Sequence, residues 1–585
     1  MSNKFYSDER NVQIVISLLK AHGVKKIIVS PGATNMTFVG SVQQDSYFEV
    51  YSSVDERSAA YIACGMAAES GEPVALSCTG ATASRNYYPG LTEAFYRKLP
   101  IVAITSHQGN NRIGHLIAQN IDRRVLPKDL VKMSVEAPII RSKDDEDFCT
   151  IEVNKALLEL RHHGGGPVHI NLFTTYSHNF NVRTLPPVRV INRYCLGNEM
   201  PSLPNGKIGI CVGSHTKFTE RLTNAVDYFC SCNNAVVFCD HTSGYHGKYR
   251  VQQALVITQL NYASPNQKVD LAIHIGEVSG DYKGLNIYSK EVWRVNEDGE
   301  LRDTYGKLTK VFEMPEDLFF EYYSKHSTSQ TKNDFLESCN NEYNSILSKI
   351  PEIPFGNIWI ANSIASKIPS GSELHLGILN SLRSWNLFKT DNSVDVFSNV
   401  GGFGIDGCVS SLIGASLINQ QKLYFGVVGD LAFFYDLNSL GNRHIRNNLR
   451  LLVVNNGKGG EFRNYRHPCS EFGEEAEPYM AASGHFGKKS LTLVKDYVES
   501  LGFDYLSAHS KESFMSVADK FLNPQIASKS IVLEAFVDSQ DDCEALKLIS
   551  NYIVDAQAFI NHKAKDALKK VIGIQGVEKL KQIVK

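Results

Sequence analysis

Short apolar runs alternate with amphipathic segments along most of this 585-residue chain. The runs are rich in Val, Ile and Leu, and the segments between them repeat apolar residues at helical spacing, as in residues 11–19 and 58–68. Strands buried on both faces of a parallel sheet show such runs, and the segments between them have the length of crossover helices. The alternation therefore predicts a doubly wound parallel α/β sheet.

The alternation recurs in three parts of the chain, which is longer than one hydrophobic core usually allows. A proline-bearing segment at 184–188 and a polar stretch at 324–333 mark breaks between these parts. We therefore predict three doubly wound parallel-sheet domains and a Lys-rich helical C-terminal extension, at 1–185, 186–345, 346–545 and 546–585. Strands are expected at 25–29, 48–53, 74–78, 101–105, 168–172, 207–212, 235–239, 271–275, 292–295, 374–379, 394–397, 423–428, 449–454 and 531–537.

Residues 423–462 carry the most informative pattern. An apolar run ends at Gly429-Asp430, a segment of helical length extends from Leu431 to about Ile445, and a second apolar run ends at Asn455-Asn456. Strand, helix and strand of these lengths form a βαβ unit, which is right-handed and parallel in nearly all cases. Asp430 and Asn456 should then stand side by side at the carboxyl edge of the sheet, where ligands of open α/β folds bind.

The residues at this edge suit a metal ion and a diphosphate. A carboxylate from Asp430, an amide oxygen from Asn456 and the backbone carbonyl of Lys458 are hard oxygen ligands, which Mg²⁺ prefers and Mn²⁺ or Ca²⁺ also accepts. Glycines at 457, 459 and 460 let the backbone approach a phosphate closely. The spacing alone leaves open that these are ordinary turn residues closing two core strands.

Composition and charge exclude several classes of function. The net charge is −2 and no Lys/Arg stripe occurs, which argues against a nucleic-acid partner. No apolar run reaches the roughly 18–20 residues of a membrane span, and the first residues are polar, so we expect a cytoplasmic protein without a signal peptide or a membrane partner. The 12 cysteines lack metal-site spacing even around Cys230, Cys232 and Cys239, and we expect buried free thiols.

Several acidic and histidine residues in the first domain are candidates for chemistry. Glu56 heads an Ala-rich helix, where an acid is stabilised by the helix dipole, so a simple capping role stays open. His107 and His115 fall in a polar segment, 106–125, and are expected to be surface loop residues. His162 and His163 precede the strand at 168–172 with no obvious acid partner nearby in sequence, and are also predicted to lie in a loop.

A dinucleotide-binding motif offers a different interpretation. Gly402, Gly404 and Gly407 form a G-x-G-x-x-G pattern between a predicted strand and a helix, with Asp430 lying 23 residues beyond Gly407. Alone, this pattern favours an NAD-dependent oxidoreductase. Because Asp430 is followed by Asn455-Asn456 in the spacing described above, the metal-and-diphosphate interpretation accounts for more of the chain.

The motifs together resemble a known family. SPG (30–32), DERSAAY (55–61), CTGATASRNYYPGLTEAFY (78–96), IVAITS (101–106) and SNVGGFGIDG (398–407), with GDL and NN, occur in the order seen in thiamine-diphosphate (ThDP) enzymes. The closest resemblance is to the branch of menaquinone-pathway succinyl-enolpyruvyl-hydroxycyclohexene-carboxylate synthases. It implies that the three domains are, in order, pyrimidine-binding, central and diphosphate-binding.

This resemblance implies roles for individual residues. Glu56 would bond the aminopyrimidine N1′ of ThDP and promote removal of the thiazolium C2 proton, with burial raising its pKa, and Gln119 would lie near the reactive carbon. Asp430, Asn456 and the Lys458 carbonyl would hold Mg²⁺. The implied cofactor contacts, including the wedge residue Ile405, are Gly80, Asn86, Ser381, Gly404, Ile405, Gly429, Leu431, Ala432, Gly459 and Gly460. The family builds its site from two subunits, which implies a homodimer or a dimer of dimers.

The chain departs from this family at its substrate arginines. Thr34, Gln108 and Val400 stand where the family carries arginine, and none of them can grip a carboxylate bidentately. Lys283 falls near a basic pair of the family that holds a substrate carboxylate. Arg57, Arg85, Arg112 and Arg383 remain, away from the family positions. The substrate residues considered are Thr34, Gln108, Lys283 and Arg383.

We therefore expect the cofactor chemistry to be kept and the substrates to differ, toward a smaller or less anionic one. The predicted function is a ThDP- and Mg²⁺-dependent carboligase that decarboxylates a 2-oxo acid and transfers the acyl unit to an acceptor. The alternatives are a simple 2-oxo acid decarboxylase, the oxidoreductase above, and a non-catalytic subunit with this fold. No flavin signature is evident.

Overall fold

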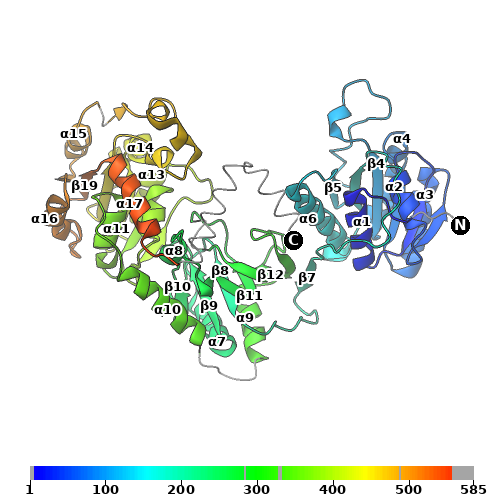
Figure 1. The fold of residues 1–585 in the computed structure, drawn as a ribbon, viewed down its shortest axis with the longest axis horizontal. Coiled ribbons are helices and arrows are strands. Elements are labelled where there is room, and N and C mark those ends of the chain that lie inside the picture. The colour runs from blue at the N-terminus through cyan, green and yellow to red at the C-terminus, as the bar shows by residue number, and fades with distance from the viewer. Residues whose placement is uncertain (1–4, 282–284, 327–332, 487–488, 556–585) are drawn as a thin grey trace. The chain divides into compact units, whose positions relative to one another are not determined.

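The computed structural model describes residues 5–281, 285–326, 333–486 and 489–555. The chain divides into two compact units, and each is described by itself (Figure 1). Unit 1 comprises Met1–Glu199 with Gly299–Glu313, and unit 2 comprises Met200–Asp298 with Met314–Lys585. The parallel α/β architecture predicted from the apolar runs is confirmed in both units.

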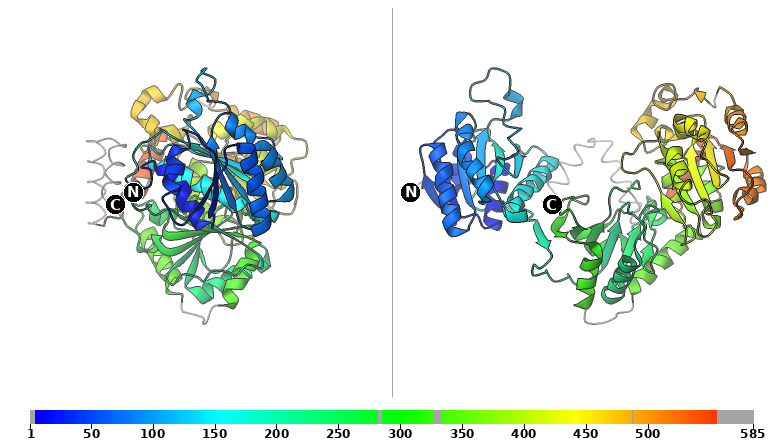
Figure 2. Two further views of the ribbon diagram at one scale, coloured as in Figure 1. Left: turned by 90° about the vertical axis from the view of Figure 1, so that its right-hand side faces the viewer. Right: turned by 180° about the vertical axis from the view of Figure 1, so that it is seen from behind.

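Unit 1 contains a six-stranded parallel sheet in the order β2-β1-β3-β4-β6-β5. Neighbouring residues of β1 point to opposite faces: Ile27 joins the core under α1 and α6, and Ile28 joins the core under α3 and α5. Helices cover both faces (Figures 1 and 2). The elements are α1 Arg10–Ala21, β1 Lys26–Val29, α2 Met36–Val42, β2 Glu49–Ser52, α3 Glu56–Ser70, β3 Val74–Thr79, α4 Thr82–Asn86, α5 Tyr88–Arg97, β4 Ile101–His107, β5 Met133–Ala137, α6 Lys143–Glu159 and β6 Val168–Phe173.

Two further strands of unit 1 form a parallel pair. β7 (Asn192–Cys195) follows the proline-bearing segment, and β13 (Leu308–Glu313) comes more than one hundred residues later. Their register places Glu313 opposite Cys195. The pairing therefore joins parts of the chain that are far apart in sequence.

The central part of unit 2 has parallel strands in the order β10-β9-β8-β11-β12. All 12 cysteines are free, and nine of them are buried, among them Cys230, Cys232 and Cys239. The expectation of burial fails at Cys195, Cys469 and Cys543, which are half-buried. The elements are β8 Ile208–Val212, α7 Glu220–Asn233, β9 Ala235–Cys239, β10 Arg250–Val251, α8 Ala254–Ile257, β11 Lys268–Ile275, β12 Tyr288–Asn296, α9 Glu316–Lys325 and α10 Asp334–Leu347.

The last part of unit 2 is a six-stranded parallel sheet ordered β15-β14-β16-β17-β19-β18. β17 alternates between two cores, with Leu452 facing one and Leu451 the other. The elements are α11 Asn357–Ile364, β14 Glu373–Leu376, α12 Asn380–Trp385, β15 Asp395–Phe397, α13 Cys408–Ser416, β16 Tyr424–Gly429, α14 Asp430–Asp436, β17 Leu449–Asn455, α15 Leu493–Ser500, β18 Asp504–Ala508, α16 Lys511–Phe521, β19 Ile531–Phe536 and α17 Ser539–Asn551.

The helix after β16 is shorter than predicted. The expected helix reaches about Ile445, whereas α14 ends at Asp436 and continues only as a 3₁₀ segment, Leu437–Gly441. Asn, Ser and Gly in this segment are weak helix formers, and the Ser439 hydroxyl donates to the Asp436 carbonyl at 2.7 Å. The helix prediction is therefore wrong over its second half, although the βαβ unit itself is present.

The sheet order also bears on the dinucleotide-binding interpretation. The glycine-rich loop connects β15 to α13, and the next strand along the chain is β16. In the sheet β14 lies between β15 and β16, and β15 is an edge strand. A dinucleotide site requires the glycine loop at a crevice where the strand order reverses. The topology therefore disfavours an NAD site at Gly402–Gly407.

The C-terminal part of the described chain belongs to the last core. Ala545 and Ile549 of α17 are buried in it. The Lys-rich extension predicted at 546–585 lies mostly in residues 556–585, outside the described residues, and the domain boundaries stay predictions. Among the residues described, no helix combines the length and the apolar character needed to cross a bilayer.

Candidate active site

The carboxyl edge of the last sheet brings the predicted metal ligands together. β16 pairs with β17 so that Gly429 lies opposite Val454, which places Asp430 beside Asn455 at the strand ends. Asp430 is the first residue of α14 and is 6% exposed, and Asn456 is half-buried. The arrangement expected from the βαβ pattern is therefore present.

Asp430 is an acid in an unfavourable environment. Burial raises its pKa to about 7, and backbone N–H groups of Asn456, Leu431 and Gly457 only partly offset this effect. Among the described residues, no cationic side chain forms an ion pair with it. A carboxylate buried in this way needs a nearby positive charge to stay ionised at neutral pH. A divalent cation would supply that charge.

The two adjacent asparagines have different environments. The Asn455 amide turns inward and donates to Glu534 at 2.7 Å. The Asn456 amide nitrogen contacts Asp542 at 3.5 Å, while its oxygen accepts from the Lys458 backbone at 3.1 Å. Asp542 is buried, and burial raises its pKa to about 6. The oxygen of Asn456 is thereby turned toward the loop that carries the Lys458 carbonyl.

Asp542 is itself held in place by α11. It accepts from the backbone N–H of Asn357 at 2.7 Å and from the Asn357 side chain at 3.1 Å. The Lys458 side chain points to Glu477, 2.6 Å away, so only the backbone of Lys458 is available at the sheet edge. The candidate metal ligands are therefore oriented by Asp542 of α17, which Asn357 of α11 holds in place, and by Glu477 of a loop.

Tight packing explains the glycines of this loop. A Cβ on Gly460 would lie 2.7 Å from the Asn456 amide nitrogen and 3.1 Å from that of Asn380. The Gly459 backbone donates to the Ala481 carbonyl at 2.6 Å. Only glycine at 460 leaves Asn456 in its observed position, because a Cβ does not approach other atoms this closely.

The remaining predicted diphosphate-site residues gather around the same strand ends. Ser381 is 3% exposed in the first turn of α12, and Ala432 is 8% exposed in α14 next to Leu431. Gly404 and Ile405 lie in the loop between β15 and α13, where Ile405 packs against both cores of the sheet. A residue that bends a cofactor needs rigid support, and the two cores provide this support for Ile405.

The second half-site lies in unit 1. Glu56 is half-buried at the first position of α3, whose N-cap Asp55 accepts from the Ser58 backbone at 2.8 Å. The Asn86 amide at the end of α4 donates to Glu56 at 3.2 Å. The structure thus joins two residues predicted to contact the cofactor. The expected burial of Glu56 is not reached within a single chain.

Gly80 is required by a close approach between β3 and β4. A Cβ at this position would lie 2.8 Å from the Ser106 carbonyl. The same carbonyl accepts from the Thr34 hydroxyl at 2.7 Å, and Thr34 is 5% exposed. Thr34 is therefore used in packing the sheet edge and has no room to be replaced by an arginine without rearrangement.

The remaining predicted substrate positions, the catalytic candidate Gln119 and Val400 lie in different local environments. Gln108 accepts from Arg112, and Gln119 is exposed with a left-handed φ of +64°. Val400 is buried against Gly280, where an added Cβ would come within 2.8 Å of it. Lys283 lies outside the described residues. The positions that resemble family arginine sites are therefore either packed or already bonded.

The histidine predictions are partly wrong. His107 ends β4 and is 3% exposed, and burial, with Arg123 nearby, lowers its pKa to about 3. His107 is the last residue of the strand and does not belong to the following loop, so it is not a surface residue. His115 is exposed, as predicted. His162 and His163 lie in a short turn, as predicted. The expected lack of a nearby acid is wrong, because Glu159, three residues before His162, lies 3.0 Å from its Nδ1, and the distant Glu313 contacts both histidines.

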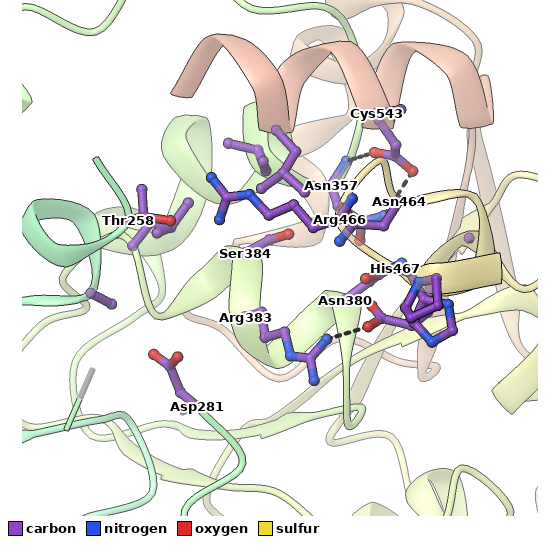
Figure 3. Close-up of a pocket in the computed structure, with 18 residues that line it drawn as sticks. Thr258, Asp281, Asn357, Asn380, Arg383, Ser384, Asn464, Arg466, His467 and Cys543 are labelled. Carbon is purple, nitrogen blue, oxygen red and sulfur yellow. Dashed lines mark hydrogen bonds and ion pairs between the residues drawn. The ribbon is translucent and has the colours of Figure 1, made fainter. Parts of the chain in front are cut away.

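A pocket of about 310 Å³ lies next to the diphosphate edge in unit 2 (Figure 3). Arg383 forms a 2.6 Å ion pair with Glu461 on one side of it. The Arg466 Nε donates to the Tyr465 hydroxyl at 2.8 Å, while its buried Nη2 has no hydrogen-bond partner among the described residues. The pocket is lined by Ala254, Thr258, Asp281, Asn357, Ile358, Asn380, Arg383, Ser384, Leu387, Gly460, Glu461, Asn464, Arg466, His467, Pro468, Asp542, Cys543 and Leu546.

Sequence reasoning named Arg383 among its candidates but singled out neither Arg466 nor His467, which line the same pocket. These residues lie in a loop just beyond the Asn-Asn motif, where the resemblance names no substrate residues. The available signal was the pair of basic residues, Arg463 and Arg466, within a few positions of the glycine run.

Comparisons with known proteins found a match to a family model and several relatives. Residues 10–126 match the model of the thiamine pyrophosphate enzyme N-terminal TPP binding domain. The 2-succinyl-5-enolpyruvyl-6-hydroxy-3-cyclohexene-1-carboxylate synthases of Bacteroides thetaiotaomicron and Phocaeicola vulgatus are each 30% identical to the chain, over 93% of it and 98% of their own length. That of Flavobacterium psychrophilum is 27% identical over 90% of the chain and 96% of its own length.

A solved structure, the thiamine-diphosphate-dependent 4-hydroxybenzoylformate decarboxylase of Rhodococcus jostii RHA1, aligns with 90% of the chain and 99% of its own. The identity is 16% and the TM-score 0.39. The sequence relatives, matched along almost their whole length, are therefore the stronger finding.

Proposed function

The chain belongs to the thiamine-diphosphate-dependent enzymes, in the family of the 2-succinyl-5-enolpyruvyl-6-hydroxy-3-cyclohexene-1-carboxylate synthases, and from this premise we propose its reaction. It decarboxylates a 2-oxo acid and transfers the resulting acyl unit to an acceptor, using ThDP and Mg²⁺ as cofactors. The buried carboxylate of Asp430 at the diphosphate edge is the observation that carries this proposal.

The residues at this edge fit the metal. Asp430 is buried without an ion-pair partner among the described residues, and a divalent cation would lower its raised pKa. The Asn456 amide oxygen and the Lys458 carbonyl complete a set of hard oxygen ligands, and Mg²⁺ would take its other ligands from water and phosphate. Glycine at 460 keeps the backbone close to Asn456, which leaves room for a diphosphate.

In this proposal, the chain's own groups position the reacting molecules and transfer protons. When bound, ThDP supplies the electron sink that lets a 2-oxo acid lose CO₂. Glu56 holds and returns a proton through its carboxylate, and Asn86 fixes the orientation of that carboxylate at 3.2 Å. Ile405, backed by two hydrophobic cores, gives a rigid apolar surface at the reacting end.

The pocket beside Gly460 is the proposed substrate site. Arg383 and Arg466 bring positive charge to it, and the unpartnered Nη2 of Arg466 would be satisfied by a substrate carboxylate. A volume of about 310 Å³ is within the range of small-molecule sites. The relatives are named synthases, which supports transfer to an acceptor over simple decarboxylation. The substrate carboxylate would thus be bound by residues other than the arginines that the family uses.

The active enzyme is proposed to be at least a homodimer. Glu56 belongs to unit 1 and Asp430 to unit 2, and the family pattern combines these half-sites from different subunits. A partner subunit would complete the burial of Glu56 that a single chain leaves unfinished.

Glu56→Gln tests the assignment most directly. The substitution keeps the shape of the side chain but cannot accept and return the proton, so CO₂ release from a panel of 2-oxo acids should be lost. Thermal stabilisation by ThDP with Mg²⁺ should stay close to that of the unmodified protein. Glu69→Gln, at the exposed far end of α3, is the matched control. Full turnover by the Glu56→Gln protein would reject the proposal.

A further inference from the structure

Unit 1 holds a cluster of potential metal ligands that includes no residue assigned a role above. His162, His163 and Glu313 present ligand atoms that all lie within 4.8 Å of one another. The Nε2 of His162 lies 2.7 Å from one oxygen of Glu313, and the Nε2 of His163 lies 2.7 Å from the other. Two imidazole nitrogens and a carboxylate therefore converge on one point.

The backbone turn is shaped to present both imidazoles together. After α6 the chain makes a 3₁₀ turn, His162–Gly164, in which His163 has a left-handed φ of +46°. This conformation is unfavourable for a residue with a Cβ, and here it stacks the two rings with their centroids 3.8 Å apart. Without it, consecutive side chains would point in different directions.

A second carboxylate orients the inner histidine. The Nδ1 of His162 lies 3.0 Å from Glu159, which is bonded in turn by Arg193 at 2.8 Å. A metal-ligating histidine commonly donates its other nitrogen to a carboxylate, which fixes the ring and its tautomer. His162 has this arrangement, with its Nε2 directed at Glu313.

The local charges indicate which kind of metal would bind. Glu159 and Glu313 are balanced by Arg193, which lies 4.0 Å from Glu313, and by Lys132, 3.5 Å from Glu159. With no excess negative charge to attract a hard cation, affinity has to come from the imidazole nitrogens. Nitrogen ligands favour Zn²⁺ over Mg²⁺ or Ca²⁺. The Cys195 thiol, 3.7 Å from Glu313, adds a soft group beside them.

We propose that His162, His163 and Glu313 form a Zn²⁺ site that is separate from the cofactor metal at Asp430. Glu313 ends β13 and His162 follows α6, so the ion would tie the β7–β13 pair to the end of α6 within unit 1. Neither the Glu56 half-site nor the Asp430 edge supplies a ligand, so the ion would stabilise the fold of unit 1, with water in the fourth position of a tetrahedral site.

Cobalt titration of the full-length, chelator-treated protein tests this site. Co²⁺ bound by nitrogen and oxygen ligands in a low-coordinate site gives visible absorption that Zn²⁺ then removes. We expect one equivalent to give this absorption in the unmodified protein and also in Asp430→Asn, which lacks the cofactor-edge carboxylate. His163→Ala should weaken binding by about tenfold or more. Its side chain is 70% exposed, so this variant should fold normally.

Two further variants make the outcome decisive. Glu313→Gln keeps the hydrogen-bonding shape but removes the charge, and should also lose the cobalt absorption. His215→Ala disrupts an ordinary His–Glu pair, 3.1 Å from Glu316, and should leave the titration unchanged. Cobalt absorption that survives in His163→Ala and Glu313→Gln but disappears in Asp430→Asn would overturn the proposal. So would the absence of binding in the unmodified protein.

Discussion

The two half-sites differ in how much of their chemistry a single chain completes. At the diphosphate edge, Asp430 is 6% exposed and burial raises its pKa to about 7. Asn456 contacts Asp542, which is held in turn by Asn357. At the pyrimidine side, Glu56 is only half-buried and contacts Asn86 at 3.2 Å. In the proposed function, the first half-site is therefore preorganised for the cofactor within one chain, whereas the second needs a partner subunit to bury its carboxyl group.

Asp430→Asn should separate the two half-sites most clearly. Removing the charged metal ligand should weaken Mg²⁺-dependent ThDP binding by roughly 100-fold or more, since even changes outside the ligand set cost about 10–100-fold. Calorimetric titration of ThDP in the presence of Mg²⁺ measures this loss. Asp519→Asn, an exposed acid on α16, is the control. Unchanged ThDP affinity in Asp430→Asn would show that the metal is held elsewhere.

Mixing two inactive proteins tests whether the half-sites come from different subunits. If Glu56→Gln and Asp430→Asn chains exchange into mixed dimers, one of the two sites in each mixed dimer contains both intact residues. Random exchange should then restore about a quarter of full activity. The measurement is CO₂ release after co-refolding or co-expression. No recovery despite verified mixed dimers would place both half-sites of one active site in the same chain.

Arg466→Gln should affect substrate binding more than catalysis. Loss of one charge-assisted contact to a carboxylate should raise KM for the 2-oxo acid by about tenfold, with a smaller effect on kcat. Steady-state kinetics with the best substrate of the panel measures both constants. Arg443→Gln, at an exposed arginine in the turn before β17, serves as the comparison. A fall in kcat with unchanged KM would contradict a role in ground-state binding.

The smallest effect concerns the pH dependence of the metal-free protein. The pKa of Asp430 is raised from 3.8 to about 7, so between these values the folded state binds more protons than the unfolded state. The free energy of unfolding should therefore fall as pH rises from about 4 to 7, by roughly 4 kcal/mol at most from this group. Asp542, with a pKa raised to about 6, acts in the same direction.

Denaturant unfolding at pH 5 and pH 8 checks this expectation. Asp430→Asn should show a smaller decrease than the unmodified protein, because the substituted amide does not titrate. Saturating Mg²⁺ and ThDP should reverse the decrease, since they stabilise the ionised carboxylate. A stability that rises with pH in the metal-free protein would contradict the buried, proton-binding state of Asp430.

Local patterns predicted the diphosphate edge because its information is local. The apolar runs ending at Asp430 and Asn456, with glycines directly after them, specify strand, turn and edge within 40 residues. The same reasoning overestimated the helix after Asp430, since helical periodicity does not report weak helix formers such as Gly441. It also placed His107 in a loop, because the end of an apolar run does not show that the strand continues through polar residues.

Other features depend on contacts that no local pattern reveals. Glu313 reaches His162 across 151 positions only because β13 pairs with β7. Arg466 lines the pocket through the path of an irregular loop, which sequence periodicity does not determine. The burial of Val400 depends on Gly280 in a different part of unit 2. Tertiary packing supplies this information, and the resemblance to a family did not contain it.

The contact between Asp542 and Asn456 has a consequence for how the enzyme is made. Asp430 and Asn456 are synthesised well before α17, the helix that carries Asp542 and completes the last core. A chain still attached to the ribosome would thus have its metal ligands but not the group that orients them. If Asp430 and Asn456 hold the metal as proposed, a chain truncated before α17 should bind the cofactor more weakly than the full chain.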